Sequence, residues 1–307
     1  MAAIPVIVHG LGNIGRQVIQ CLETAPDMEC VGVVRSPASV GTKKTDLRGV
    51  PDFAGLEALE KERGRAQVVV ICGPSRMVPD DAARYLAAGL HTVDSFDIHD
   101  RIPALVEQLD AAAKKAGRTS ITAAGWDPGT DSVLRALFEA MTPTGTTFTN
   151  FGRGRSMGHS VAARAVRGIA DATSVTIPIG GGRHSRLVYV LPEEGADREE
   201  IKKNLAADAY FSHDPLDVRF VGSAAELATV VDNSHGVLLE RIGASGLTSN
   251  QRLSFDMRID NPALTAQVLV SCARAATRMA PGCHTLIDVP PVALLPGDRM
   301  GNIARLV

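Results

Sequence analysis

The sequence has few cysteines, and their spacing excludes two classes of protein. Its 307 residues contain five cysteines, an odd number: Cys21, Cys30, Cys72, Cys272 and Cys283. No two of them form a C-x-x-C pair, which argues against a zinc ribbon and a disulfide scaffold and suits a reducing compartment. The eight histidines show no H-E-x-x-H or other ligand spacing, so we predict no metal site.

Long hydrophobic runs and a charge imbalance are absent as well. No apolar run approaches the ~20 residues of a membrane helix. The chain does not open on a basic segment followed by an apolar core and a cleavage site, because the first predicted strand begins almost at once. A net charge of −2 with 45% hydrophobic residues indicates neither disorder nor a broad nucleic-acid-binding field. We therefore expect a cytoplasmic protein that binds neither membranes nor nucleic acid, long enough for two domains.

The clearest pattern present is a glycine-rich turn between a predicted strand at residues 4–8 and a predicted helix at residues 16–24. Free backbone N–H groups and the positive end of the helix dipole there can hold a pyrophosphate. Gly10 permits the tight turn, Gly12 lets backbone approach the phosphates, and Gly15 lets helix pack close to strand. The turn predicts a dinucleotide site, although a glycine turn of some other α/β protein remains the alternative.

The residue after the second predicted strand (29–34) indicates which dinucleotide binds. NAD-binding proteins place Asp or Glu there to hold the ribose 2′-hydroxyl, whereas this chain has Arg35. A guanidinium cannot accept a hydrogen bond from a hydroxyl, but its planar fork suits a 2′-phosphate, so NADP is favoured. Ser36, Lys43 and Lys44 can assist. The alternative for Arg35 is a solvated cation at a strand end.

The first ~125 residues alternate predicted strands and helices, which is typical of a doubly wound parallel sheet. After the opening unit we expect strands at 67–72, 91–94 and 120–124 and helices at 78–88 and 102–116. Ligands of such sheets bind beyond the carboxyl ends of the strands. The residues expected at the cofactor are therefore Gly10, Leu11, Gly12, Asn13, Ile14, Gly15, Arg35, Ser36, Cys72, Gly73, Pro74, Ser75, Ser95, Phe96, Asp97, Gly125, Trp126, Asp127, Pro128 and Gly129.

The pattern changes between residues 148 and 259, where strands are expected at 174–177, 186–191, 218–221, 237–242 and 253–259. In the last of these, apolar and polar residues alternate, which indicates an antiparallel sheet with one face open to water or a partner. Asn261 and Pro262 then suit a helix cap and a first helical position, opening a helix at 263–279. We expect this helix to pack back on the nucleotide-binding part, and the exposed sheet to form a dimer at least.

Several segments together resemble meso-diaminopimelate D-dehydrogenases over nearly the whole chain. They are the glycine turn and residues 93–99 (VDSFDIH), 124–129 (AGWDPG), 157–160 (MGHS), 234–236 (SHG) and 260–266 (DNPALTA). The length suggests the compact form of the family. The resemblance implies a Rossmann-type NADP domain at 1–125, an α/β substrate-binding and dimerisation domain with a mixed or antiparallel sheet at 126–261, and a segment at 262–307 that returns to the first domain.

The resemblance also implies a reaction and a site. Such enzymes use NADP to oxidise the D-centre of meso-2,6-diaminopimelate to an imine, which water converts to L-2-amino-6-oxopimelate and ammonia; the reverse is reductive amination in lysine and cell-wall precursor synthesis. Asp97 and Asp127 match the carboxylates at the reacting amine, where one can orient or deprotonate water. The other positions matched to substrate contacts are Trp126, Phe151, Met157, Gly158, Thr176, Arg186, His235 and Asn261, with Arg186 holding the distal carboxylate.

Each of these residues also has a plain structural interpretation. Asp127, before a proline, can start a turn and cap the helix near residue 130, and Asp97 can pair with Arg101. His235 can be a structural histidine, Asn261 only a helix cap, Trp126 a core residue and Arg186 a solvated charge. The chain also departs from familiar members of the family in following Arg35 with Ser36 rather than a second arginine, and in having Phe151 where some carry Trp.

Two other functions are compatible with a nucleotide-binding domain of this kind. A dihydrodipicolinate reductase or an aspartate-pathway dehydrogenase would require a basic His-rich segment or a catalytic lysine, respectively, and neither is found in the sequence. A non-catalytic NADP-sensing regulator would require a nucleic-acid-binding or partner module. Asp97 and Asp127 at the strand ends fit catalysis better.

Overall fold

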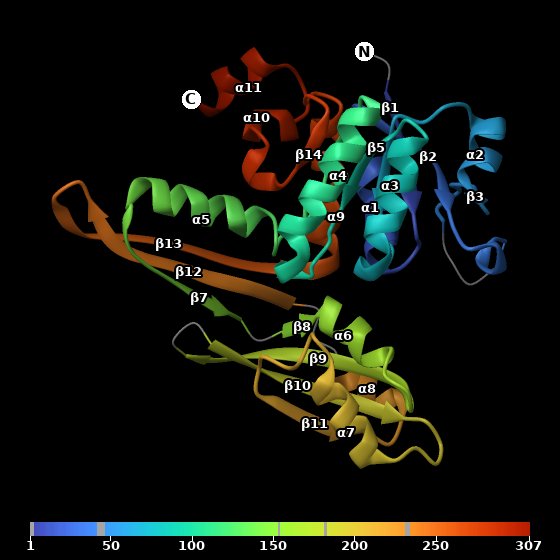
Figure 1. Ribbon diagram of the computed structural model, residues 1–307, viewed down its shortest axis with the longest axis vertical. Coiled ribbons are helices and arrows are strands. Elements are labelled where there is room, and N and C mark those ends of the chain that lie inside the picture. The colour runs from blue at the N-terminus through green and yellow to red at the C-terminus, as the bar shows by residue number, and fades with distance from the viewer. Residues whose placement is uncertain (1–2, 42–46, 153, 181–182, 231–233) are drawn as a thin grey trace. The chain divides into compact units, whose positions relative to one another are not determined.

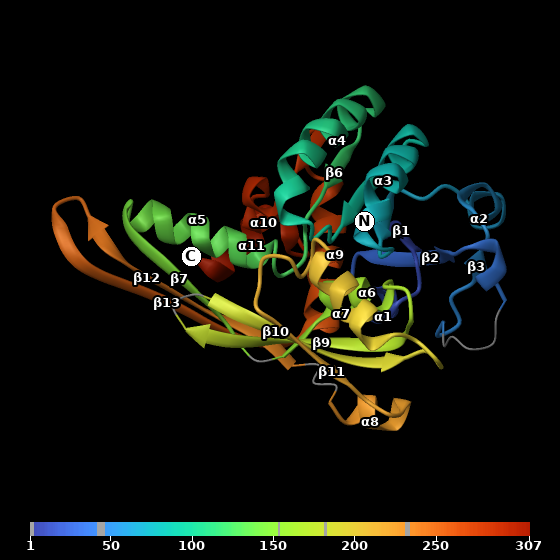
Figure 2. The ribbon, with the colours of Figure 1, turned by 60° about the horizontal axis from the view of Figure 1, so that its bottom comes forward.

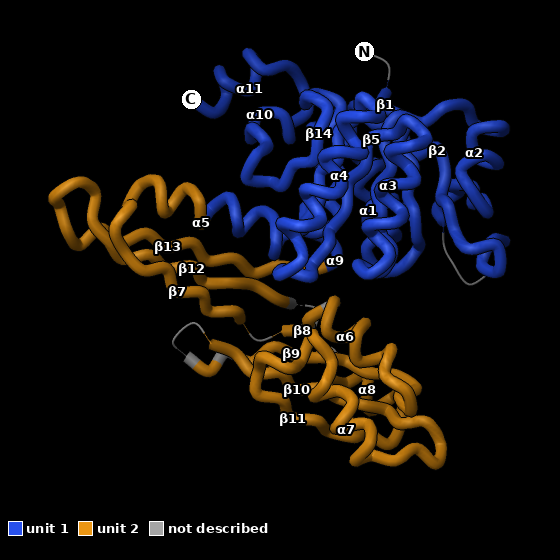
Figure 3. Tube along the Cα trace, in the orientation of Figure 1, with its two compact units in different colours: residues 1–134, 262–307 blue, residues 135–261 orange. Residues whose placement is uncertain are grey.

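The chain forms two compact units, which are coloured separately in Figure 3. The structure, a computed structural model, describes residues 3–41, 47–152, 154–180, 183–230 and 234–307. Unit 1 comprises Met1–Leu134 and Pro262–Val307, and unit 2 comprises Arg135–Asn261. Within the described ranges, no helix has the length and apolar character needed to cross a membrane.

Unit 1 is built on one parallel sheet of seven strands. Their order across the sheet is β3-β2-β1-β4-β5-β6-β14, with every neighbouring pair parallel. The chain therefore reverses its direction of winding between β1 and β4, the place at which such sheets bind ligands. The strands are β1 (Ile4–His9), β2 (Met28–Val34), β3 (Asp52–Phe53), β4 (Val68–Ile71), β5 (His91–Asp94), β6 (Thr119–Ile121) and β14 (Gly282–His284).

Helices cover both faces of this sheet, as Figures 1 and 2 show. Alternate β1 residues point to opposite faces: Val6 and Val8 pack with α1 and α9, and Ile7 packs with α2, α3 and α4. The helices are α1 (Asn13–Glu23), α2 (Leu56–Arg63), α3 (Val78–Ala87), α4 (Ile102–Ala116) and α9 (Asn261–Ala276). The predicted Rossmann-type fold is confirmed.

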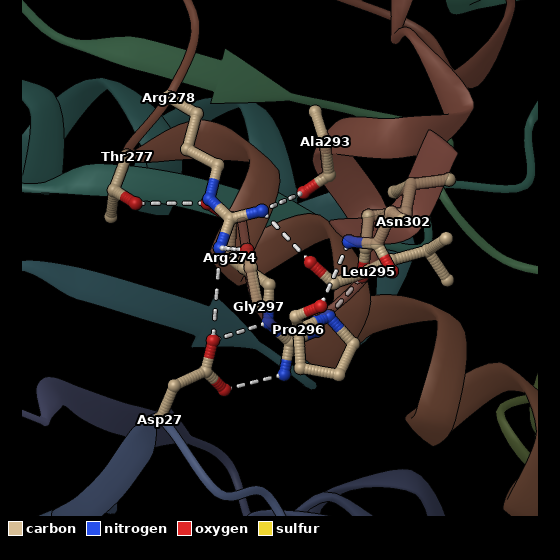
Figure 4. Close-up of polar contacts among 10 residues, drawn as sticks. Asp27, Arg274, Thr277, Arg278, Ala293, Leu295, Pro296, Gly297 and Asn302 are labelled. Carbon is tan, nitrogen blue, oxygen red and sulfur yellow. Dashed lines mark hydrogen bonds and ion pairs between the residues drawn. The ribbon is translucent and has the colours of Figure 1, made fainter. Parts of the chain in front are cut away.

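Two arginines, Arg274 in α9 and Arg278 just after it, bind the C-terminal segment and the rest of unit 1 (Figure 4). The guanidinium of Arg274 donates two hydrogen bonds to the Asp27 carboxylate, at 2.6 and 2.7 Å, and one to the carbonyl of Leu294 at 2.8 Å. Arg278 donates to the Leu295 carbonyl at 2.8 Å. These bonds fix the segment that carries α10 (Pro291–Leu294) and α11 (Arg299–Leu306).

Unit 2 contains two further sheets. One has the order β11-β10-β9-β8 and is mixed, since β10 pairs parallel with β11 and antiparallel with β9. The other, β13-β12-β7, is antiparallel. The strands are β7 (Thr144–Phe151), β8 (Gly154–Ser156), β9 (Ile169–Gly180), β10 (Arg183–Pro192), β11 (Leu216–Phe220), β12 (Ser234–Ser245) and β13 (Thr248–Asp260); the helices are α5 (Thr130–Met141), which begins in unit 1, α6 (Met157–Arg164), α7 (Arg198–Ala207) and α8 (Ala224–Thr229).

The predicted antiparallel sheet is confirmed, and its two faces differ as expected. Leu253, Phe255 and Met257 of β13 are half-buried, whereas the residues between them are exposed. On the buried face the guanidinium of Arg241 donates to the carbonyl of Thr142 from two nitrogens, at 2.6 and 2.9 Å. A buried arginine thus ties β12 to the end of α5.

Several expected boundaries were wrong. The first helix begins at Asn13 rather than 16, because the glycine turn leads directly into it, and the last ends at Ala276 rather than 279. The strand expected at 120–124 ends at Ile121, since Ala123 has a left-handed backbone with φ of 52°. Asn261 is the first residue of α9 rather than its cap. Short elements without strong periodicity were not foreseen: β3, α2, β8, α6, α7, α8, β14, α10 and α11.

Candidate functional site

The glycine turn at the end of β1 has the geometry of a phosphate cradle. Gly10 has a φ of 92°, which a side chain would oppose, and Gly12 precedes α1 in extended conformation. A Cβ on Gly15 would overlap the carbonyl oxygen of Gly10, so α1 approaches β1 as only glycine allows. A Cβ on Gly12 would meet no protein atom within 4 Å. The open space at Gly12 lies where a pyrophosphate can meet the N–H groups of α1.

Beside the turn lies a cavity of about 450 Å³ at the carboxyl ends of β1, β2 and β4. It is lined by His9, Val34, Arg35, Ser36, Pro37, Ala54, Gly55, Leu56, Gly73, Pro74, Met77, Asp81, Arg84 and Tyr85. Four expected cofactor residues, Arg35, Ser36, Gly73 and Pro74, are among them. Lys43 and Lys44 lie outside the described residues. Because the cavity is lined by His9, which immediately precedes the glycine turn, and lies at the winding reversal of the sheet, it has the position of an adenosine site.

Arg35 is held in that cavity by a carboxylate that the sequence did not single out. Its Nη1 lies 2.9 Å from Oδ2 of Asp52 on β3, and the same oxygen accepts the Gly41 N–H at 3.1 Å. Burial acts to raise the pKa of Asp52, but the bonds from Gly41 and Arg35 outweigh it and hold this pKa below its ordinary value. The guanidinium is thus fixed at the end of β2 by an ionised partner.

His9 and Tyr85 form another wall of the same cavity. Their rings meet edge to face at 5.4 Å, and His9 Nδ1 lies 3.9 Å from the carboxylate of Asp81. Burial lowers the pKa of His9, so the imidazole is neutral at neutral pH. The Arg84 guanidinium lies over the Tyr85 ring, 5.0 Å from its centre. Flat rings and a cation near them suit a purine base.

The expected carboxylates of unit 1 follow β5 and β6. Asp97 is half-buried, and its Oδ1 accepts a hydrogen bond from Ser75 Oγ at 2.6 Å. Asp127 is half-buried beside Trp126, which is 5% exposed, and precedes a cis proline, Pro128. Backbone bonds from Thr130 N and Asp131 N to the Gly125 and Trp126 carbonyls join this segment to α5. Ser75, Asp97 and the Trp126 segment thus come from three adjacent strand ends.

A second cluster lies in unit 2 around Arg186. This guanidinium is 9% exposed and bonds to Thr176 Oγ1 at 2.6 Å, Asp214 Oδ2 at 2.8 Å and His184 Nε2 at 2.6 Å. Thr176 and Arg186 are direct register partners on β9 and β10. Burial, followed by the Arg186 charge, lowers the pKa of His184, so its ring is neutral and can accept from Arg186. The result is a pre-oriented cation of the kind that binds carboxylates.

The aromatic residue expected at the substrate lies in this cluster. The Phe151 ring meets His184 at 5.4 Å and His235 at 6.2 Å, both edge to face. His235 is buried, and its Nδ1 accepts the Gly236 N–H at 2.7 Å, which leaves Nε2 as the proton-bearing nitrogen. Unit 2 therefore brings together four of the expected substrate residues: Thr176, Arg186, Phe151 and His235.

The remaining expected substrate residues sit at helix starts. Met157 and Gly158 are the first two residues of α6, where backbone N–H groups have no partner within the helix and can hold an anion. Asn261 is buried at the start of α9. Within the described ranges, no group of three or more His, Cys, Asp or Glu side chains could hold a metal ion.

Comparison with known proteins assigns the family. A model of the diaminopimelic acid dehydrogenase C-terminal domain matches residues 125–261. The chain is 47% identical to a meso-diaminopimelate D-dehydrogenase of Bacteroides fragilis over 307 residues, covering all of both chains. The chain belongs to the meso-diaminopimelate D-dehydrogenase family. The predicted membership is confirmed, and the full-length match favours it over the reductases and the regulator considered from the sequence.

Two solved structures match this one over the whole chain. A C. glutamicum DAP dehydrogenase in complex with DAP is 29% identical, with a TM-score of 0.89 and complete coverage of both chains. An engineered D-amino acid dehydrogenase bound to NADP+ is 28% identical, also with a TM-score of 0.89 and complete coverage of both.

Three residues that bond to the expected site residues Arg186 and Arg35 were not predicted from the sequence: His184, Asp214 and Asp52. One of them had a usable signal. His184 precedes Arg186 by two residues on a predicted strand, and side chains two apart share a face. Asp214 and Asp52 reach their arginines only through pairing of distant strands, which no local pattern shows.

Proposed function

We propose that the protein catalyses the NADP-dependent oxidation of meso-2,6-diaminopimelate at its D-centre, giving L-2-amino-6-oxopimelate, ammonia, NADPH and a proton with the consumption of one water, and the reverse reductive amination. The full-length identity of 47% to an enzyme of this name carries the proposal. Two local features support it: a glycine cradle in unit 1 and a pre-oriented arginine in unit 2.

The residues of unit 1 fit NADP. Gly12 leaves space for the pyrophosphate, and Arg35 in the adjoining cavity supplies a planar fork for a 2′-phosphate. Asp52 holds that fork at the end of β2, and Ser36 adds a hydroxyl beside it. When bound, the cofactor supplies the nicotinamide that accepts the hydride. The remaining expected contacts are the strand-end segments 72–75, 95–97 and 125–129.

The chemistry assigned to the protein's own residues begins with charge. Asp97 and Asp127 hold the ammonium of the D-centre, and one of them orients or deprotonates the water that attacks the imine. Trp126, which is nearly buried, forms a wall that excludes bulk water from the imine. Phe151 and Met157 border the substrate, and the Gly158 N–H donates to the carboxylate of the reacting centre.

At the other end of the substrate, Arg186, Thr176 and His235 hold the distal carboxylate, and Asn261 adds a contact. The guanidinium is already fixed by Asp214, Thr176 and His184, so little side-chain entropy is lost on binding. A simple amino acid lacks the second carboxylate and forgoes the bonds that this site offers it, which disfavours such substrates.

We further propose that the protein is a homodimer or higher homo-oligomer in the cytoplasm. The open face of the β13-β12-β7 sheet carries Phe148 and Ile242, 39% and 42% exposed, beside the exposed charges Arg252, Asp256 and Arg258. Mixed charges around apolar side chains are complementary to a second copy. All five cysteines are free thiols, as a reducing compartment requires. Light scattering should give at least twice the chain mass of 32.3 kDa, and a value of one chain mass contradicts the assembly.

One assay tests the activity: NADPH formation from meso-diaminopimelate, with the L,L isomer and NAD as controls. No turnover of the meso isomer would sink the proposal. Asp127→Asn should bind NADP as the wild type does and lose about 100-fold or more in kcat, because the amide cannot serve as a base or pair with the ammonium. Asp100→Asn, an exposed carboxylate near Asp97, is the matched control. Full activity of Asp127→Asn removes this residue from the site.

A further inference from the structure

A buried carboxylate outside the assigned site joins the two segments that carry Asp97 and Asp127. Asp94 ends β5, and none of its surface is exposed. Its Oδ1 accepts three hydrogen bonds: from the Phe96 N–H at 2.9 Å, the Thr122 hydroxyl at 2.8 Å and the Ala123 N–H at 3.3 Å. One oxygen thus receives donors from two separate stretches of chain.

Those stretches are the ones that present the carboxylates. Phe96 immediately precedes Asp97, while Thr122 and Ala123 begin the turn that leads to Trp126 and Asp127. The Asp94 backbone adds a fourth bond, since the Ala124 N–H donates to its carbonyl at 2.9 Å. Side chain and backbone of one residue therefore set the spacing between the two segments.

The second segment needs such support because its backbone is strained. Ala123 has a φ of 52°, a left-handed conformation in which the Cβ of an alanine crowds the following carbonyl. Non-glycine residues keep this conformation where surrounding bonds over-determine it. Here the Ala123 N–H is held by Asp94 Oδ1, and Thr122 N donates to the His284 carbonyl at 2.9 Å.

Burying a carboxylate costs more free energy than a neutral acceptor would if its role were only structural. Asp94 Oδ2 has no hydrogen-bond partner among the described residues. Burial raises the pKa of Asp94 to about 6, against the three bonds to its charged form. The titratable groups that interact with it from neighbouring elements are the thiols of Cys272 on α9 and Cys283 on β14, whose own pKa values burial raises, so both thiols are neutral. No cation among them offsets the charge.

We propose that Asp94 is a positioning residue for the dehydrogenase reaction, whose carboxylate fixes the Asp97 segment against the Trp126–Asp127 segment so that both site carboxylates meet one ammonium. The expected effect on kcat rests on the proposed function. The expected effect on the position of the two segments rests on the hydrogen bonds alone. The proposal predicts that weakening the acceptor alters the Trp126 segment and kcat more than it alters NADP affinity. The contacts expected for the pyrophosphate and the 2′-phosphate follow β1 and β2 and stay in place, and only the cofactor contacts of segments 95–97 and 125–129 shift.

The test compares Asp94→Asn, which keeps an acceptor but removes the charge, with Thr92→Val. Thr92 is the matched control, since it is fully buried on the same strand and its hydroxyl donates to Ser120, outside both segments, at 2.8 Å. Trp126 is the chain's one tryptophan, so its fluorescence reports this segment directly. Acrylamide quenching of the cofactor-free protein, NADPH affinity, and kcat and KM for meso-diaminopimelate are measured on each.

For Asp94→Asn we expect stronger quenching of Trp126, a kcat lower by about 10- to 100-fold, and NADPH affinity within about threefold of wild type, as small displacements of reacting groups cost rates of this order. Thr92→Val should match wild type in all three. If Asp94→Asn does not fold, Thr122→Val removes one of the three donors and should shift quenching and kcat in the same direction. Wild-type quenching and kcat in Asp94→Asn, or equal losses in Thr92→Val, overturn the proposal. If the wild type fails to oxidise the substrate, the proposed function falls while the quenching comparison still decides the positioning role.

Discussion

Asp94→Asn should change how the stability of the protein depends on pH. The folded-state pKa of about 6 lies above the ordinary 3.8, because burial disfavours the charged carboxylate. Asp94 therefore contributes stability that is complete below pH 3.8 and is lost as the pH rises through about 6. A pKa raised by this amount corresponds to about 3 kcal/mol, of which about 2 kcal/mol falls between pH 4.5 and pH 7.5. Asparagine does not titrate, so the difference between the two proteins isolates this group.

Urea unfolding followed by far-UV circular dichroism, at several pH values in that range, measures the difference in unfolding free energy. The wild type should lose about 2 kcal/mol relative to Asp94→Asn as the pH rises from 4.5 to 7.5. Thr92→Val, which removes a buried hydroxyl but no titrating group, should show a constant difference from wild type. A difference for Asp94→Asn that stays constant, or that moves in favour of the wild type with rising pH, refutes the assignment of a buried, titrating carboxylate.

Three further substitutions probe the cradle, the distal site and the chain end. Gly15→Ala should lower both the NADPH affinity and the melting temperature, because overpacking against Gly10 costs about 1–3 kcal/mol of unfolding free energy. Gly12→Ala places its Cβ in open space and should lower the affinity alone. Equal melting temperatures for the two variants would contradict the geometry. Arg186→Lys should raise KM for meso-diaminopimelate by about 10-fold or more, because a lysine cannot reproduce the planar fork; an unchanged KM removes Arg186 from the distal site. Arg274→Met should lower the unfolding free energy by about 1–3 kcal/mol, because it removes two bonds to the Asp27 carboxylate and one to the Leu294 carbonyl. Exposed Arg299→Met should change it little, and equal effects of the two substitutions would contradict a stabilising role for the Arg274 bonds.

Much of unit 1 could be predicted from the sequence because its signals are local. Each of these signals lies within about ten residues of sequence. They are the apolar run of β1, the glycines that follow it, and the apolar periodicity of helices α3 and α4. The strand 91–94 and the helix 102–116 have the bounds expected for them. In unit 2 the two-residue alternation of β13 predicted an antiparallel sheet with one polar face, because that periodicity follows directly from which face is buried.

The parts that could not be predicted depend on contacts between distant segments. Asp52 meets Arg35 because β3 pairs with β2, and Asp214 meets Arg186 because β11 pairs with β10. The sequence does not indicate the proposed positioning role of Asp94, because an aspartate at a strand end is equally expected to bind a ligand. Short helices such as α7 and α8 have little apolar periodicity of their own. Their local signals are the N-cap side chains Asp197 and Ser223, and packing of one or two buried residues stabilises each helix further.

The return of residues 262–307 to unit 1 has a consequence for synthesis on the ribosome. Helix α9 supplies Ala266, Leu269 and Val270 to the apolar cluster that covers Val6 and Val8 of β1. Chains are made from the N-terminus, and domains that are contiguous can fold as they emerge. Here the nucleotide-binding sheet leaves the ribosome with one face covered by α1 but not by α9 while all of unit 2 is still being translated. That face is a place where a chaperone can bind the nascent chain, and a stalled or truncated product would keep it exposed.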